Sequence, residues 1–314
     1  MKDKTIQLSV IAPMFNEQEV IVPFLQQTLA VLCENFEWFE LILVDDGSSD
    51  RTIERCMPFI EQYPQIRILK FSRNYGHEIA STAGFDYAQG NYVILMDADL
   101  QHPPALIVAM LEKAEEGFDV VCAQQNQRPV ESKLRRLFSK LYYKISKRMT
   151  GLDIPQGQGN FRLLSRAVVE SLKKMRENNR HLVMLFAYMG FKTGSIYYDC
   201  PPRAAGVSKY NFKKLINLAL DSMIGFSGRP LRTMAKFSIF ISIVMMFYAG
   251  FILIQKLLSP AHLIDGLASV IFLIAGLFSV LFLFLAFISE YISRILIETK
   301  NRPLYYIQQE IQKR

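Results

Sequence analysis

Two long apolar stretches in the C-terminal third constrain this chain more than any other feature. Residues 234–258 carry only Lys236 before Lys256, and residues 267–289 carry no charged side chain. As α-helices that rise about 1.5 Å per residue, both are long enough to cross the roughly 30 Å hydrocarbon layer of a bilayer. Their residues are apolar on all faces, which favours membrane spans over a buried hairpin of core helices in a soluble protein.

The surroundings of these stretches predict their orientation. The linker 259–266 contains Pro260 and Gly266 and is short enough for an antiparallel hairpin. Neither stretch lies at the N-terminal end, so we do not expect a cleaved signal peptide. Lys and Arg gather near the outer ends of the hairpin, which predicts that both termini and the preceding polar part of the chain are cytosolic. Residues 290–314 would then form a cytosolic tail.

The polar part of the chain alternates between two hydrophobic patterns. Short apolar runs typical of buried strands occupy residues 8–12, 41–44, 66–71, 92–96 and 120–122, and helical spacing occupies 20–33, 52–60, 79–88 and 106–115. This order predicts an α/β domain over residues 1–202, with a mainly parallel sheet and helices on both faces. Asn16 and Glu19 fit a capping box for the first helix, and Pro103 and Pro104 fit the first turn of the fourth.

Polar clusters follow four of the expected strands. They read PMFNE at 13–17, DDGSSD at 45–50, SRNYGH at 72–77 and DADLQHPP at 97–104. Ligands of open parallel sheets bind beyond the carboxyl ends of the strands. The four clusters therefore predict one binding site along this edge.

The last cluster carries the pattern of a cation site. Asp97 and Asp99 flank a small residue, and Gln101 offers a third side-chain oxygen. Two carboxylates at this spacing can bind one hard divalent cation, which can neutralise a diphosphate. Acidic pairs also occur in ordinary turns and helix caps, so this motif alone leaves that alternative open.

The other clusters allow binding and structural interpretations side by side. Asp45 and Asp46 end an apolar strand, where a carboxylate can accept hydrogen bonds from a base or ribose. For Asp50 we favour a cap of the helix that begins near residue 52. Asn16 can bind a ligand or only cap its helix. Arg73 and His77 can face phosphate or solvent.

Taken together, the four clusters resemble the GT-A glycosyltransferases of family 2, in the same order and spacing. GNFRLLSR at 159–166 and PPRAAGVSKY at 201–210 narrow the resemblance. The chain looks like the bacterial polyprenyl-phosphate glycosyltransferases, relatives of dolichol-phosphate-mannose synthase with a C-terminal membrane hairpin. The resemblance covers nearly the whole chain. It implies an inverting transfer of a hexose-type sugar from a nucleotide-sugar to polyprenyl (undecaprenyl) phosphate at the inner membrane of a bacterium.

The resemblance also implies roles for individual residues. It places a divalent metal, Mg²⁺ or Mn²⁺, at Asp97, Asp99 and Gln101, and it assigns a uracil-type base to Asp46. We expect the nucleotide-sugar pocket to comprise Pro13, Asn16, Glu17, Asp45, Asp46, Asn74 and Asp97. The catalytic residues would be Asp97, Asp99, Asn160 and Arg162, and the acceptor phosphate would lie near Arg203, Ser208 and Lys209.

One position departs from the family pattern. Related enzymes commonly carry an aspartate, a candidate catalytic base, where this chain has Asn160. A phosphate monoester has a second pKa of about 6, so the acceptor is already largely anionic at pH 7. An acceptor of this kind can attack the anomeric carbon without a base, and Asn160 would orient the sugar or the acceptor by hydrogen bonding.

The net charge of +7 is concentrated in residues 128–148 and 203–236. Groove-reading and base-stacking motifs are missing from the sequence, so we expect no nucleic-acid partner and assign these segments to an anionic membrane surface or lipid head group. Residues 131–149 fit an interfacial helix with one apolar and one basic face, or a helix packed on the sheet. Residues 203–233 would form a juxtamembrane segment with a second amphipathic helix, at 212–226.

Two other functions compete with this interpretation. A processive polysaccharide synthase usually has a QxxRW motif and more spans, but the only tryptophan here is Trp38. A catalytically silent membrane scaffold would need a degenerate site, whereas the DADLQ segment is intact. The apolar spans suit a homo-oligomer of unspecified size, and the sequence does not distinguish among hexoses.

Overall fold

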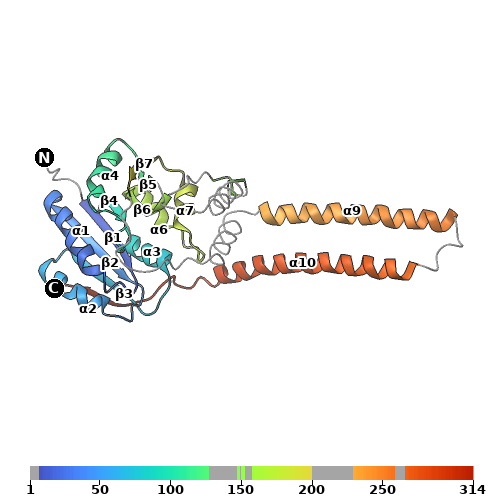
Figure 1. Ribbon diagram of the computed structural model, residues 1–314, viewed down its shortest axis with the longest axis horizontal. Coiled ribbons are helices and arrows are strands. Elements are labelled where there is room, and N and C mark those ends of the chain that lie inside the picture. The colour runs from blue at the N-terminus through green and yellow to red at the C-terminus, as the bar shows by residue number, and fades with distance from the viewer. Residues whose placement is uncertain are drawn as a thin grey trace. The chain divides into compact units, whose positions relative to one another are not determined.

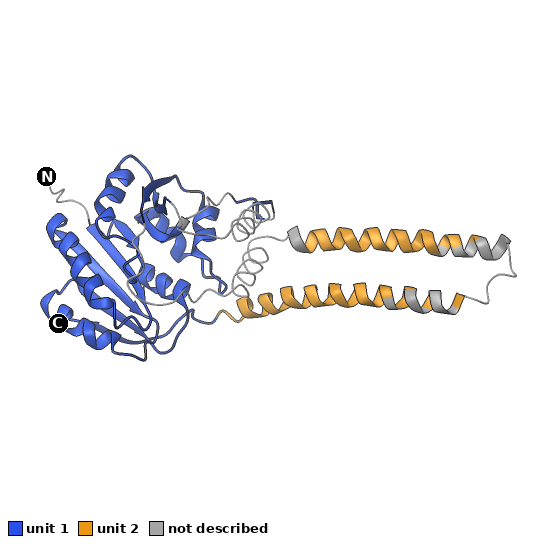
Figure 2. Cartoon of the chain, viewed as in Figure 1, with its two compact units in different colours: residues 1–217, 302–314 blue, residues 218–301 orange. Residues whose placement is uncertain are grey.

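The computed structural model describes residues 7–126, 147–148, 150–152, 158–199, 229–258 and 266–313. The chain divides into two units, one of residues 1–217 together with 302–314, the other of residues 218–301 (Figure 2). Apart from Lys147 and Arg148, the expected interfacial helix at 131–149 lies outside the described residues. The same holds for the juxtamembrane segment up to residue 228, including Arg203, Ser208 and Lys209.

The first unit is an α/β domain (Figure 1). Its elements are β1 (Gln7–Met14), α1 (Ile21–Asn35), β2 (Trp38–Asp45), α2 (Thr52–Gln62), β3 (Ile66–Phe71), α3 (His77–Tyr87), β4 (Tyr92–Leu95), α4 (Leu106–Glu115), β5 (Val120–Gln125), β6 (Gln158–Ser165), α6 (Arg166–Lys173), α7 (Leu182–Met189), β7 (Thr193–Tyr198) and β8 (Ile307–Gln312). All five expected strands and all four expected helices are present. The strands β6, β7 and β8 are additions to that expectation.

The strands form one sheet in the order β7-β5-β6-β4-β1-β2-β3-β8. β1 pairs in parallel with β2 and β4, and β2 pairs in parallel with β3. β6 lies between β4 and β5 and is antiparallel to both. The mainly parallel α/β fold is therefore confirmed. Because β6 runs in the opposite direction, its first residues lie at the edge where the parallel strands end.

Helices cover both faces of this sheet (Figure 1). The apolar sides of α1, α2 and α4 pack on one face with alternate residues of the central strands, for example Leu8 and Val10 of β1. The next residue, Ile11, points to the opposite face, where α3, α6 and α7 lie. This alternation is the period-2 pattern of a strand buried on both faces.

Two expected helix starts differ from the structure. α1 begins at Ile21, and its N-cap Val20 has no side-chain cap hydrogen bond, so the capping box of Asn16 and Glu19 is wrong. Asn16 instead adopts a left-handed φ of 56° and bonds to the loop after β2. Pro103 and Pro104 lie in the turn just before α4, whose N-cap is Ala105.

Gly84 of α3 packs closely against β1 of the sheet. A Cβ there would lie 2.1 Å from Cγ2 of Ile11. We expect Gly84→Ala to lower the free energy of unfolding by about 1–3 kcal/mol through overpacking. In the double variant Gly84→Ala/Ile11→Ala, the new methyl group occupies space vacated by Ile11, so the loss should be smaller than the sum of the single losses. Thermal unfolding of all three variants tests this, and strict additivity would contradict it.

The second unit consists of two long helices, α9 (Arg229–Leu258) and α10 (Leu267–Thr299). Leu231–Tyr248 and Gly276–Thr299 are long and apolar enough to cross a membrane, and neither window is buried within the chain. At 30 and 33 residues, the helices are longer than the expected spans 234–258 and 267–289. Past residue 289, Glu290 and Arg294 form an i,i+4 ion pair of 3.0 Å on the surface of α10, which adds a small stabilisation to the helix.

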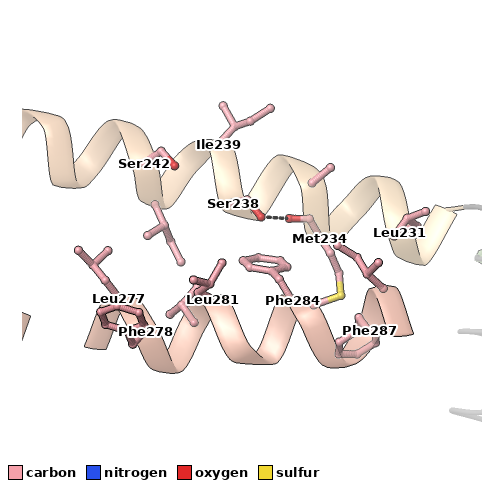
Figure 3. A pocket seen from close by; sticks show the side chains of 14 residues that line it. Leu231, Met234, Ser238, Ile239, Ser242, Leu277, Phe278, Leu281, Phe284 and Phe287 are labelled. Atoms are coloured by element: carbon pink, nitrogen blue, oxygen red, sulfur yellow. Dashed lines mark hydrogen bonds between the residues drawn. The ribbon is translucent and has the colours of Figure 1, made fainter. Parts of the chain in front are cut away.

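A groove of about 650 Å³ lies between α9 and α10 (Figure 3). Its lining is apolar, with Met234 from α9 facing Phe284 and Phe287 from α10. The hydroxyl of Ser238 donates a hydrogen bond of 3.1 Å to the carbonyl of Met234, one turn earlier in the helix. That bond satisfies the hydroxyl inside the helix, so the groove presents an almost wholly apolar surface.

Candidate active site

The loops after β1, β2 and β3 are joined at the carboxyl edge of the sheet. Asp46, only 4 % exposed, accepts the backbone N–H of Tyr75 at 2.6 Å and that of Gly76 at 2.9 Å. Burial raises the pKa of Asp46, and these two hydrogen bonds to the carboxylate counteract part of that rise. Asp46 thus holds the loop after β3 in place.

The loop after β2 also fits closely against its neighbours. Gly47 has a φ of +76°, and a Cβ on it would lie 2.7 Å from the carbonyl carbon of Arg73. On the other side, the Asn16 carboxamide oxygen accepts the N–H of Ser49 at 2.9 Å, and the Asn16 N–H donates to the Ser48 hydroxyl at 2.9 Å. Asn16 therefore belongs to the site as a connection between two loops and not as a helix cap.

Asp45 and Asp50 take structural positions in this loop. Asp45 is fully buried and accepts the N–H of Ser48 at 3.2 Å, so its carboxylate closes the turn after β2. Asp50 accepts the N–H of Thr52 at 3.0 Å at the start of α2. The N-cap residue of α2 is Arg51, so Asp50 bonds the first residue of α2 from one position before the N-cap.

Asp97 lies at the centre of the site. Its Oδ1 is 2.7 Å from Nε2 of His77, the first residue of α3. The other ring nitrogen of His77, Nδ1, is 3.4 Å from Nδ2 of Asn160 on β6. Three distant segments of the sequence therefore meet here, and His77 connects the expected metal ligand Asp97 to the position where the family has aspartate.

The ion pair of His77 and Asp97 changes the titration of the imidazole. Burial opposes the charged ring, but the hydrogen bond and charge of Asp97 outweigh it and raise the pKa of His77 to about 9. The side chain of His77 is 40 % exposed, so solvent partly screens this pair. The ring of His77 contacts Asp97 and is also exposed to solvent, so His77 is a surface residue that faces the site.

His102 supports the backbone of Asp97. The Asp97 N–H donates to Nδ1 of His102 at 2.9 Å, and the His102 ring stacks on Phe161 of β6 with centroids 4.8 Å apart. A nitrogen that accepts a hydrogen bond carries no proton, so Nδ1 is the unprotonated nitrogen. We did not single out His102 from the sequence; its position three residues after Asp99 was the available signal.

Asp99 and Gln101 lie on the strained turn after β4. Leu100 between them has a left-handed φ of 64°, which is unusual for a leucine. Asp99 accepts the N–H of Gln101 at 3.1 Å and is half-buried. Strain of this kind is common where a loop is shaped for binding.

The described residues contain no group of three or more His, Cys, Asp or Glu side chains that could hold a metal ion. Asp97 and Asp99 are the carboxylates at the carboxyl end of β4. A set of one or two carboxylates suits Mg²⁺ or Mn²⁺ when phosphate oxygens of a substrate complete the coordination. The residues present therefore fit a metal that binds together with a diphosphate.

Arg162 is placed differently from what the resemblance implies. It is 2 % exposed, its Nε donates to the carbonyl of Gly159 at 3.0 Å, and its guanidinium lies 4.9 Å from the ring centre of Phe186 in α7. Burial lowers the pKa of Arg162. In this structure Arg162 supports β6 through its bond to Gly159 and its contact with Phe186.

The remaining expected pocket residues line the same edge at varying depth. Pro13 is buried in β1, Glu17 is half-buried and donates its N–H to the Thr52 hydroxyl at 2.9 Å, and Asn74 is exposed. Arg73 lies over the ring of Tyr75, with its guanidinium carbon 4.0 Å from the centroid. The structure thus brings all the described pocket residues to one edge of the sheet.

Sequence comparisons place this chain in a family. Residues 9–173 match the family described as glycosyl transferase family 2. A glycosyltransferase of Synechocystis sp. is 39 % identical over 303 residues, which cover 96 % of this chain and 95 % of the relative. A bactoprenol glucosyl transferase of Shigella phage SfV is 34 % identical over 309 residues, which cover 98 % of this chain and 100 % of the relative.

Solved structures with low sequence identity share the fold. A mannosyltransferase from Pyrobaculum calidifontis, solved with GDP-Man and Mn²⁺, has a TM-score of 0.52 at 18 % identity. The match covers 74 % of this chain and 66 % of the mannosyltransferase. Glucosyl-3-phosphoglycerate synthase from Mycobacterium tuberculosis, solved with Mn²⁺, UDP and phosphoglyceric acid, has a TM-score of 0.50 at 16 % identity. The match covers 70 % of this chain and 77 % of the synthase. With a GT-A fold, this family match and these full-length relatives, the chain belongs to glycosyl transferase family 2 and is a glycosyltransferase.

Proposed function

We propose that this enzyme moves a hexose from a nucleotide-sugar, with uridine as the nucleoside, to the phosphate of a polyprenyl phosphate at the cytosolic face of the bacterial inner membrane. The observation that carries the proposal is the pairing of a GT-A site with two long apolar helices in a chain matched end to end by a bactoprenol glucosyl transferase. Bactoprenol is a polyprenol, and its phosphate stays in the bilayer. The relative's name makes UDP-glucose the first donor to test.

The carboxylates after β4 would hold the metal. Asp97 and Asp99, with Gln101 beside them, would bind Mg²⁺ or Mn²⁺ together with the diphosphate of the donor. Such an ion supplies positive charge to the departing nucleoside diphosphate. His77 holds Oδ1 of Asp97 at 2.7 Å, and His102 holds its backbone, so the carboxylate is oriented before the donor arrives.

The loops after β1, β2 and β3 would bind the nucleoside. Asp46 would read the base, in a pocket completed by Pro13, Asn16 and Glu17. The Asp46 carboxylate already accepts two backbone N–H groups, which fixes its orientation. A fixed acceptor can favour one pattern of base N–H groups over another, and this supports a role in choosing the base.

The transfer itself needs no protein base under this proposal. An oxygen of the acceptor phosphate forms a bond to the anomeric carbon while the bond from that carbon to the diphosphate breaks, and the nucleoside diphosphate leaves with the electron pair. One displacement of this kind inverts the configuration. Because the acceptor oxygen is already anionic, Asn160 is compatible with the reaction, and its amide beside His77 can orient the acceptor or the sugar.

The path of the chain supports a hairpin with both ends on one side of the membrane. The chain leaves the first unit before α9 and rejoins it after α10, where β8 pairs with β3. Two spans joined in this way return the chain to the side from which it started. Lys and Arg near the outer ends of α9 and α10 favour the cytosol as that side.

The proposal is tested by transfer of radiolabel from a panel of UDP- and GDP-sugars to undecaprenyl phosphate, with purified protein in lipid. We expect labelled lipid from one UDP-hexose, and loss of the product in EDTA that excess Mn²⁺ or Mg²⁺ restores. Transfer from GDP-sugars alone would contradict the assignment of uridine. Full activity in EDTA would contradict the metal.

The same assay separates the competing functions. A processive polysaccharide synthase would give a polymer that grows with time, whereas this proposal predicts one sugar per lipid. A silent scaffold would bind nucleotide and form no product with any acceptor. The only tryptophan, Trp38, lies at the start of β2. The residues before it do not match QxxRW, and this already disfavours a processive synthase.

A further inference from the structure

The segment after α10 is part of the catalytic domain. β8 pairs antiparallel with β3, from Arg67 opposite Gln312 to Phe71 opposite Ile307. The N–H of Ser72 donates to the carbonyl of Tyr306 at 3.1 Å and carries this pairing into the loop after β3. The expectation of a separate tail at 290–314 is therefore replaced by a helix extension followed by an edge strand.

Tyr305 anchors this segment on two elements, β3 and α3. Its ring stacks on Phe71, with centroids 5.1 Å apart and planes inclined by 16°. Its hydroxyl donates to Oδ2 of Asp86 in α3 at 2.8 Å, and Arg176 donates to both oxygens of Asp86 at 2.9 Å. Leu304 beside it is buried. A ring with this many partners holds one position, which an exposed chain end would not.

The contacts of Tyr305 continue to the donor side of the site. Phe71 packs edge-on against Tyr75, with centroids 5.5 Å apart. The backbone N–H of Tyr75 is one of the two groups that the Asp46 carboxylate accepts, at 2.6 Å. The loop between Phe71 and His77 is thus held by Asp46 on one side and by the stacked rings on the other.

We propose that Tyr305 is a positioning residue for nucleotide binding, which acts through Phe71 and Tyr75 on the loop that orients Asp46. The inference rests on the proposed role of Asp46 in nucleoside recognition. It makes the segment that directly follows the second apolar helix a structural part of the donor site. A merely structural role of β8 would stabilise the domain without changing how the folded protein binds nucleotide.

The test compares two neighbouring tyrosines in the full-length protein in lipid nanodiscs. Tyr305→Ala removes the stacked ring and the hydroxyl. Tyr306→Ala is the matched control, because that side chain is 57 % exposed and only its backbone carbonyl bonds to Ser72. We expect Tyr305→Ala to weaken UDP binding about 10-fold by calorimetry, because a displaced loop no longer holds Asp46 in its binding orientation, and Tyr306→Ala to leave it unchanged.

Hydrogen exchange of the nucleotide-free proteins gives a second readout. In Tyr305→Ala the amides of Tyr75 and Gly76 should exchange faster, while the amides of β1 and β2 keep their protection. Tyr305→Phe retains the ring and should bind UDP like the wild type. If Tyr305→Ala yields no folded protein, Tyr305→Leu, which keeps apolar volume next to Leu304, takes its place.

The outcomes separate this inference from the proposed function. Wild-type protein that binds no uridine or guanosine nucleotide would overturn the proposed function, while exchange at Tyr75 and Gly76 would still decide whether Tyr305 holds the loop. A Tyr305→Ala protein with a lower melting temperature, wild-type UDP affinity and unchanged exchange at Tyr75 and Gly76 would overturn the positioning role.

Discussion

Asp99→Asn is expected to lower kcat/KM for lipid glycosylation by about 10³-fold, with little change in stability. The substitution removes one of the two carboxylate charges that would hold the metal and the diphosphate. Asp99 accepts the N–H of Gln101 at 3.1 Å, and the amide oxygen of asparagine can still accept this bond. The measurement is steady-state transfer to polyprenyl phosphate over a Mn²⁺ titration, with Mn²⁺ binding followed by electron paramagnetic resonance.

Asp119→Asn is the matched control for this loss. Asp119 lies just before β5, at the opposite edge of the sheet, and accepts the hydroxyl of Ser165 at 3.1 Å. The same chemical change there should leave kcat/KM and Mn²⁺ binding close to those of the wild type. Equal activity of Asp99→Asn and Asp119→Asn would mean that the DADLQ segment does not hold the metal.

The second large effect is expected for Gly47→Ala. Any L-residue at a φ of +76° is strained by about 1–2 kcal/mol, and here the Cβ would also lie 2.7 Å from the carbonyl carbon of Arg73 and 2.9 Å from the nitrogen of Asn74. Backbone atoms cannot move to relieve this steric clash as a flexible side chain can. We expect the free energy of unfolding to fall by about 2–4 kcal/mol and the donor KM to rise about 10-fold, because the loop after β3 must move.

Gly190→Ala separates the clash from the backbone strain. Gly190 has a φ of +68° at the end of α7, and a Cβ there would meet nothing within 4 Å. The Gly190→Ala variant should lose only the free energy of unfolding that comes from backbone strain, about 1 kcal/mol, and its donor KM should not change. Thermal unfolding and donor kinetics of both variants decide the matter. A Gly47→Ala enzyme with the wild-type KM would show that the contact between the loops is not needed for donor binding.

The elements of the sheet that are locally encoded were predictable from the sequence. Each of β1 to β5 is an apolar run bounded by turn residues, and burial on both faces leaves little choice but a strand. The polar clusters after β1 to β4 follow from the same pattern, since turn residues and charged side chains end each apolar run. The spacing of Asp97 and Asp99 predicts a cation site, because two carboxylates so placed can bind one divalent ion.

Other features depend on contacts between distant segments and left weak traces in the sequence. The run IQQEIQ of β8 is mostly polar, and it is a strand only because β3 offers unpaired backbone groups at the sheet edge. The sequence around His77 and His102 does not distinguish them from other histidines. They contact Asp97 because α3 and the turn after β4 bring them together in the folded chain. Arg162 carries a charge, yet it is buried because Phe186 and the carbonyl of Gly159 surround it.

Hydrophobic periodicity and turn chemistry were thus sufficient for the fold class, the two apolar helices and the edge of the sheet that carries the site, because these properties reside in short stretches of chain. The tertiary structure decided which polar side chains face one another and which are buried. It turned Asn16 from an apparent helix cap into a bridge to Ser48 and Ser49, and it returned the chain after α10 to the catalytic sheet. Hydrogen-bond partners and stacking partners are chosen by proximity in space, and spacing along the sequence predicts the shared sheet edge but not the individual partners.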